Sequence, residues 1–341
     1  MQPAFGTWNI RGYANVAQPR RADPGTLHQV GGRTMGTTWS VRFGNPQLIP
    51  LQSVSDAAEA ALASVVTQMS HWEPDSDLGR FNRADAGHWQ PLPPEFQRVM
   101  RCAIAHAEAS GGAFDPTMGA LVDAWGFGPR DDGAAPSGRD TPPTAAEIDA
   151  ARARCGWRRL AFDDQGRLRQ PGGLRLDLSG IAKGFSVDRV ADALGALGIT
   201  DCLVEVGGEL LARGQRPDGL PWRVAVDTGV GQSQVALPLR GLAIATSGDA
   251  WHAFDHEGRR YSHTLDPRSG EPVHHRLASV TVLHAECMQA DALATTLTVL
   301  GPDDGLAFAR ERDLPALFVE RGAPGTLATP RMTPAFERLL P

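Results

Sequence analysis

A single lysine stands in the stretch DLSGIAKGFSVDRVADAL, residues 177–194. The chain has 33 Lys and Arg residues, and all of them except Lys183 are arginine. The Ser179-Gly180 turn and the apolar spacing after it predict a helix that begins near Ile181. The helix dipole opposes a cation in this first turn. Lys183 and the backbone N–H groups around it therefore suit a phosphate or carboxylate ligand, and a lysine that only packs over the glycine turn is the alternative.

Two oxygen-bearing side chains lie four residues apart in ADALATTL. A helix predicted over residues 290–300 would place Asp291 and Thr295 on one face. Hard oxygens at this spacing suit Mg²⁺, which takes a few protein oxygens and keeps waters or substrate phosphates. An aspartate that only caps the helix explains the same pattern.

Further candidates lie in predicted turns. His263, before Asp266-Pro267, has a side chain that exchanges protons near neutral pH, and a structural hydrogen bond is the alternative. Asp115 precedes Pro116 and either contacts a ligand or caps a turn.

Glycines flank other candidates. Gly207-Gly208, in VGGEL, lets the backbone approach a ligand closely or forms a β-bulge. Ser247 lies in a turn after a predicted strand. Trp125 and Phe127, between glycines, either stack on a planar ring or pack in the core.

Composition excludes several classes of function. The 341 residues are 42% hydrophobic and 21% charged, which is typical of a soluble globular protein with one large domain or two smaller ones. A net charge of −6 without a basic run disfavours binding to nucleic acids or acidic membranes. The four cysteines lack C-x-x-C spacing, so neither a zinc site nor a disulfide framework is indicated.

Hydrophobic patterning predicts the elements that must position these residues. We expect an irregular leader over residues 1–30 and one domain over 31–341, with a Pro/Gly-rich linker near 128–143. Strands mixed with long helices favour an α+β fold. The expected elements are a strand at 34–43, helices at 53–72, 94–110, 144–155 and after Gly180, a β meander over 157–178, and strands between 202 and 283. The N-terminus shows no apolar signal region, so the chain as it reads is expected to be cytoplasmic.

Eight segments, in order, resemble the FAD:protein FMN transferase family, the flavin transferases that are also described as thiamine-biosynthesis-lipoprotein-like. The resemblance spans residues from about 30 to 300. It implies a T-fold-like α+β domain with mixed or antiparallel sheets and packed helices, which binds FAD and Mg²⁺. The implied reaction moves FMN onto a threonine hydroxyl of a target redox subunit with a Ser/Thr-Gly-Ala-Thr-like motif, and releases AMP. The segments are TMGT (34–37), SDLGRFN (76–82), GAFDPT…WGFG (112–128), DLSGIAKG (177–184), VGGEL (206–210), ATSGD (245–249), HTLDPRSGEPV (263–273) and ADALATTL (290–297).

The resemblance also implies roles for individual residues. His263 would deprotonate the threonine, and Lys183 would stand beside the pyrophosphate as a second catalytic residue. Mg²⁺ would be held by the Ala182 carbonyl and by the Asp291 and Thr295 side chains. The residues that would contact FAD are Met35, Trp72, Asp115, Lys183, Glu209, Ser247 and His263.

The chain departs from the family pattern at two places. Ala250 follows SGD where the family usually has an aromatic residue, and Trp251 comes next. Family members are often exported lipoproteins, whereas the first cysteine here is Cys102. Two other functions stay open: a FAD pyrophosphatase that gives FMN and AMP, and a flavin carrier without catalysis. The Asp291/Thr295 pair favours an enzyme over a carrier.

Overall fold

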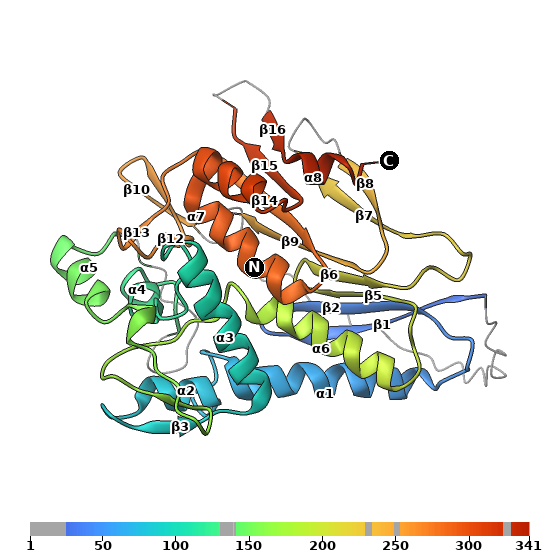
Figure 1. Ribbon diagram of the computed structural model, residues 1–341, viewed down its shortest axis with the longest axis horizontal. Coiled ribbons are helices and arrows are strands. Elements are labelled where there is room, and N and C mark those ends of the chain that lie inside the picture. Colours follow the sequence, from blue (N-terminus) through green and yellow to red (C-terminus); the bar gives the residue numbers. More distant parts are fainter. Residues whose placement is uncertain are drawn as a thin grey trace, which may run out of the picture.

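An antiparallel sheet forms the centre of the molecule (Figure 1). The computed structural model describes residues 25–129, 139, 141–228, 234–248, 253–322 and 329–340. The eight strands of this sheet are all paired antiparallel, in the order β1-β2-β5-β6-β9-β14-β15-β16. Their bounds are β1 Leu27–Thr34, β2 Thr37–Gly44, β5 Cys202–Val206, β6 Glu209–Arg213, β9 Leu242–Gly248, β14 Leu277–His284, β15 Ala316–Glu320 and β16 Thr329–Met332.

Long helices cover one face of the sheet (Figure 1). These are α1 (Leu51–Met69), α6 (Ala182–Ala196) and α7 (Cys287–Glu311). The apolar stripe expected after Gly180 is buried at Val187, Val190 and Leu194, in one core cluster with residues of β2 and β5. On the opposite face, a second cluster is made with β7 (Trp222–Asp227), β8 (Gln234–Leu239) and α8 (Pro334–Glu337). The expectation of an α+β fold is confirmed.

Smaller elements pack beside this body, on the left in Figure 1. A third cluster joins them to the long helices, with Phe96 and Met100 on one side and Phe185 and Ala292 on the other. In the described part of the chain, no helix is both long enough and apolar enough to cross a membrane. The smaller elements are α2 Asp77–Arg83, β3 Trp89–Pro91, α3 Pro94–Ala109, α4 Gly119–Ala124, α5 Ala145–Arg152, a 3₁₀ turn Trp157–Arg159, β4 Arg167–Arg169, β10 Ala253–His256, β11 Arg259–Ser262, β12 Leu265–Asp266 and β13 Glu271–Pro272.

The single strand expected at 34–43 is a hairpin instead. Thr34 pairs with Thr37, and the two turn residues Met35 and Gly36 have φ of 48° and 72°. Positive φ at both positions is the geometry of a two-residue turn whose twist matches the flanking strands. Strand β1 therefore begins at Leu27, inside the segment 1–30 that was expected to be irregular. Residues 1–24 lie outside the described residues, as do 130–138 and 140 of the expected linker.

The β meander expected over 157–178 is wrong. Among its residues only Arg167–Arg169 form a strand, which pairs with β3. Gln170, which is fully buried, replaces the ladder: its Oε1 accepts from the N–H groups of Gly172 and Leu174, and its Nε2 donates to the carbonyls of Phe81 and Leu174. Before it, Phe162 and Leu168 form an isolated antiparallel bridge. After it, residues 172–174 form a loop whose backbone groups are satisfied by the Gln170 side chain.

The last long helix breaks where its end was expected, after Leu300. The backbone at Gly301 is non-helical, with φ 85°, and Pro302 follows it. Element α7 therefore consists of two helical parts, and the second begins at Pro302, where the missing N–H of a proline costs little.

Candidate functional site

Two glycines bring the start of α6 against α7. A Cβ added to Gly184 would clash with the Cys287 carbonyl and lie 2.7 Å from the Asp291 Cβ. A Cβ at Gly180 would lie 2.9 Å from the Thr295 Oγ1. Only residues without a side chain permit this approach. The first turn of α6, with Ala182 and Lys183, therefore lies beside the face of α7 that carries Asp291 and Thr295.

The two helices exchange caps at this crossing. The Gly184 N–H, in the first turn of α6, donates to Asp291 Oδ2 over 2.8 Å. The N–H groups of Cys287 and Met288, at the start of α7, donate to Asp188 Oδ1 and Oδ2, each over 2.9 Å. A carboxylate from each helix thus satisfies unpaired donors at the positive end of the other helix. The exchange fixes where Asp291 sits relative to Lys183.

Asp188 is a site residue that the sequence reasoning missed. It is 6% exposed, inside the apolar stripe of α6. Burial raises its pKa to about 6, against the lowering effect of the Met288 and Cys287 N–H groups. The one signal in the sequence was an acidic residue between Val187 and Val190, two positions of the predicted apolar stripe.

Lys183 has an anionic partner within the protein. Its Nζ lies 2.6 Å from Glu209 Oε1, and the side chain of Glu209 is only 3% exposed. Burial, reinforced by Asp291, raises the pKa of Glu209 to about 7. Burial also raises the pKa of Asp291, which Lys183 counteracts. Burial acts to lower the pKa of Lys183, but Glu209 and Asp291 outweigh it and raise that pKa.

The Lys183–Glu209–Asp291 cluster combines two carboxylates with one ammonium. Glu209 Oε2 is buried and has no hydrogen-bond partner. In the described residues no three His, Cys, Asp or Glu side chains gather in a way that could hold a metal ion. The available donors are instead one carboxylate, the Thr295 hydroxyl and a backbone carbonyl, a sparse oxygen set that fits Mg²⁺ with waters or phosphate oxygens. The residues present therefore fit the metal that the sequence suggested.

Removal of Lys183 is expected to destabilise the protein. Lys183→Ala leaves Glu209 buried without its partner, which should lower the free energy of unfolding by roughly 1–2 kcal/mol, because the lysine is partly exposed. Urea unfolding of the protein without ligand measures the effect. The double variant Lys183→Ala/Glu209→Gln should recover most of the loss. A single variant as stable as the parent would show that the ion pair contributes nothing.

Other residues that the sequence singled out lie on separate segments, each with its own local partners. Met35 lies in the β1–β2 turn and packs against two core clusters. Trp72 follows α1, is 40% exposed, and has its ring 5.1 Å from that of His71. Ser247 lies in β9, not in a turn, and is half-buried opposite Val280.

Asp115 belongs to a local loop network. Its Oδ1 accepts from the N–H and the hydroxyl of Thr117, and its Oδ2 accepts from the Trp157 N–H over 3.3 Å. Burial raises its pKa, while these hydrogen bonds lower it. Asp115 therefore organises its own turn, which was the second of the two roles expected for it.

His263 lies in an aromatic cluster. Its ring meets Phe127 edge-on, with centroids 6.4 Å apart. Trp125 is buried and donates from Nε1 to the Gly270 carbonyl over 2.8 Å, so it packs in the core. Ala250 and Trp251 lie outside the described residues.

The family assignment follows from comparison with known proteins. The model of the ApbE family matches residues 35–318, which is most of the chain. The chain belongs to the ApbE family.

Relatives of this ApbE protein carry names that agree with the expected activity. A Vibrio cholerae protein named FAD:protein FMN transferase is 38% identical, over 87% of this chain and 88% of its own. A Haemophilus influenzae protein with the same name is 34% identical over 90% of each chain. The apo crystal structure of the Pseudomonas stutzeri flavinyl transferase ApbE is similar with a TM-score of 0.84 and 39% identity, covering 92% of this chain and 97% of that one. The expectation of a transferase enzyme is confirmed, and the substrates of this chain are taken up below.

Proposed function

We propose that this protein transfers the FMN half of FAD onto a threonine hydroxyl of a target redox protein and releases AMP. The observation that carries the proposal is the Lys183–Glu209–Asp291 cluster at the start of α6, where an ammonium and a metal-ready carboxylate lie side by side. A pyrophosphate placed there is neutralised on both sides. The names of the relatives, FAD:protein FMN transferase, support the transfer of FMN from FAD to a protein.

The transfer is an in-line displacement at phosphorus. The threonine oxygen forms a bond to the phosphorus of the FMN phosphate, the bond from that phosphorus to the bridging oxygen breaks, and AMP leaves with its electron pair. The hydroxyl proton passes to His263. Positioning and charge neutralisation dominate the catalysis of such transfers.

The residues around α6 divide the work. The Ala182 carbonyl, Asp291 and Thr295 would hold Mg²⁺, which when bound neutralises pyrophosphate charge. Lys183 steadies the pyrophosphate by charge-assisted hydrogen bonds, and Glu209 fixes the position of its ammonium. The residues that would contact the rest of FAD are Met35, Trp72, Asp115 and Ser247, while His263 would act on the threonine hydroxyl.

His263 is expected to act on rate more than on binding. His263→Ala should slow transfer roughly 10²-fold or more, the usual loss when a general base is removed. The affinity for FAD should stay nearly unchanged. Single-turnover rates and FAD titration separate the two quantities. Equal losses in rate and FAD affinity would instead assign His263 to ligand positioning.

One incubation tests the whole proposal. The protein is mixed with FAD, Mg²⁺ and a peptide that carries a Ser-Gly-Ala-Thr sequence, and the products are identified by mass spectrometry. The expected products are AMP and a peptide with FMN on its threonine. FMN and AMP without modified peptide would identify a pyrophosphatase, and unchanged FAD would identify a carrier.

A further inference from the structure

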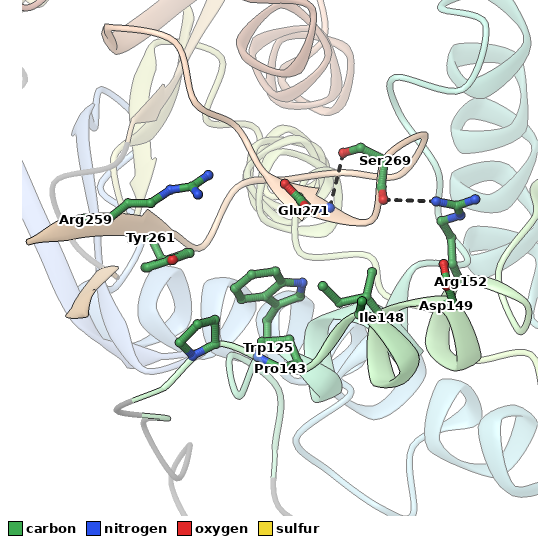
Figure 2. Close-up of a pocket in the computed structure, with 11 residues that line it drawn as sticks. Trp125, Pro143, Ile148, Asp149, Arg152, Arg259, Tyr261, Ser269 and Glu271 are labelled. Atoms are coloured by element: carbon green, nitrogen blue, oxygen red, sulfur yellow. Dashed lines mark hydrogen bonds between the residues drawn. The ribbon is translucent and has the colours of Figure 1, made fainter. Parts of the chain in front are cut away.

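A cavity lies apart from the Lys183–Glu209–Asp291 cluster. It has a volume of about 350 Å³ and is open to solvent, between the α5 segment on one side and β11 and β13 on the other (Figure 2). Its volume is within the range of about 300–1,000 Å³ that binding sites show. None of the residues proposed to hold FAD or Mg²⁺ lines it. The α5–β11 cavity is therefore separate from the residues proposed to hold FAD and Mg²⁺.

The α5–β11 cavity presents mainly polar groups to solvent, above apolar side chains that are fixed in the core. Figure 2 shows Trp125 and Ile148 on the side of the helices, facing the strand segment that carries Ser269 and Glu271. Trp125 is 2% exposed and held by its hydrogen bond to the Gly270 carbonyl. Aromatic walls that are already fixed lose little conformational entropy when a ligand binds.

The charges of the cavity favour a polypeptide over a nucleotide. Arg152 and Arg259 line it together with Asp149 and Glu271, so positive and negative groups balance. The phosphates of a nucleotide would meet the two carboxylates at a cost. A polypeptide segment offers backbone donors and acceptors and side chains of both charges, which such a polar lining with both signs of charge can pair with.

A chain of packed rings joins the cavity to His263. Tyr261, a wall residue, stacks on Phe254 with centroids 5.1 Å apart, and Phe254 lies 6.0 Å from Phe127. Phe127 in turn meets the edge of the His263 ring. The cavity wall and the proposed general base are therefore held in one aromatic cluster.

We propose that the α5–β11 cavity binds the polypeptide that accepts FMN, through a segment that flanks the target threonine. The inference rests on the proposed function, because a transferase with two substrates needs a second recognition surface that FAD leaves free. Binding here would place the acceptor beside β11, which His263 directly follows in the chain.

A matched pair of variants on α5 tests this inference. Ala145 is exposed and lines the cavity, whereas Ala150 is exposed on the same helix and does not. Ala145→Trp should raise the KM for the Ser-Gly-Ala-Thr peptide about tenfold or more, the effect of losing an anchor contact. Ala150→Trp should leave it unchanged. The KM for FAD should be the same in both variants and the parent. An unchanged peptide KM in Ala145→Trp would overturn the inference.

Calorimetric titration of the peptide into the protein without FAD separates this inference from the proposed function. Binding by the parent and by Ala150→Trp, but not by Ala145→Trp, supports the cavity even if no FMN is transferred. FMN transfer with equal peptide affinity in all three proteins overturns the cavity and leaves the function intact. A parent that neither binds nor modifies the peptide contradicts both.

Discussion

Asp291→Asn should slow Mg²⁺-dependent FMN transfer by roughly 10³-fold, as when a pre-organised electrostatic contact to a reacting group is removed. The asparagine keeps an oxygen for the Gly184 N–H, which Asp291 accepts over 2.8 Å, so the helix crossing persists. It loses the negative charge that would bind the cation. The measurements are initial rates of transfer over a series of Mg²⁺ concentrations, and Mg²⁺ titration by calorimetry.

The stability of Asp291→Asn separates a chemical effect from a structural one. Burial raises the pKa of Asp291, which means that the fold disfavours its charged form. Removal of the charge should therefore leave the unfolding free energy of the metal-free protein equal or higher. Asp192→Asn, on the exposed face of α6 with Arg189 and Arg213 as partners, is the control and should retain full transfer. Transfer by Asp291→Asn at the parental rate with parental Mg²⁺ dependence would contradict the role proposed for Asp291.

The elements that the sequence predicted well are those with one buried face. The strand CLVEV was expected at 202–206 and is β5, and the apolar stripe of Val187, Val190 and Leu194 marked α6. In such elements the buried positions are apolar and the exposed positions are polar, so the periodic pattern of residue types predicts the element.

What the sequence could not predict depends on partners far along the chain. Glu209 pairs with Lys183, which lies 26 residues away in the sequence. Asp188 accepts from Cys287, at the start of α7, which lies 99 residues away. The Gln170 side chain, which bonds the backbone of residues 172–174 and the distant Phe81 carbonyl, was equally invisible in the pattern of the expected meander. The spacing of residues within one segment cannot predict hydrogen bonds between segments that are distant in the sequence. The resemblance to a family named Glu209 as a site residue, but nothing local identified Asp188.

Asp188→Ala should cause a large loss of stability. The variant leaves the N–H groups of Cys287 and Met288 without acceptors at a buried helix start. Hydrogen bonds to a charged group contribute roughly 1.5–3 kcal/mol each, and the two share one carboxylate, so we expect the unfolding free energy to fall by roughly 2–4 kcal/mol. Urea unfolding measures it. Asp192→Ala, on the same helix but exposed, should change the unfolding free energy by less than about 1 kcal/mol. Equal losses of unfolding free energy in Asp188→Ala and Asp192→Ala would show that Asp188 contributes no more to stability than a surface charge.

The pH dependence of Asp188→Asn gives an independent readout of the same carboxylate. The pKa of Asp188 in the folded protein is about 6, above its ordinary value of 3.8, because burial disfavours the charge. The native state therefore holds this proton more tightly than the unfolded state, and the contribution of Asp188 to stability falls as the pH rises from about 4 to about 6. Asparagine does not titrate, so the stability of the variant should lack this decline. The unfolding free energy of the parent minus that of Asp188→Asn should therefore fall as the pH rises over that window. A constant difference would show that Asp188 titrates in the folded protein as it does in the unfolded chain, and that the cap is open to water.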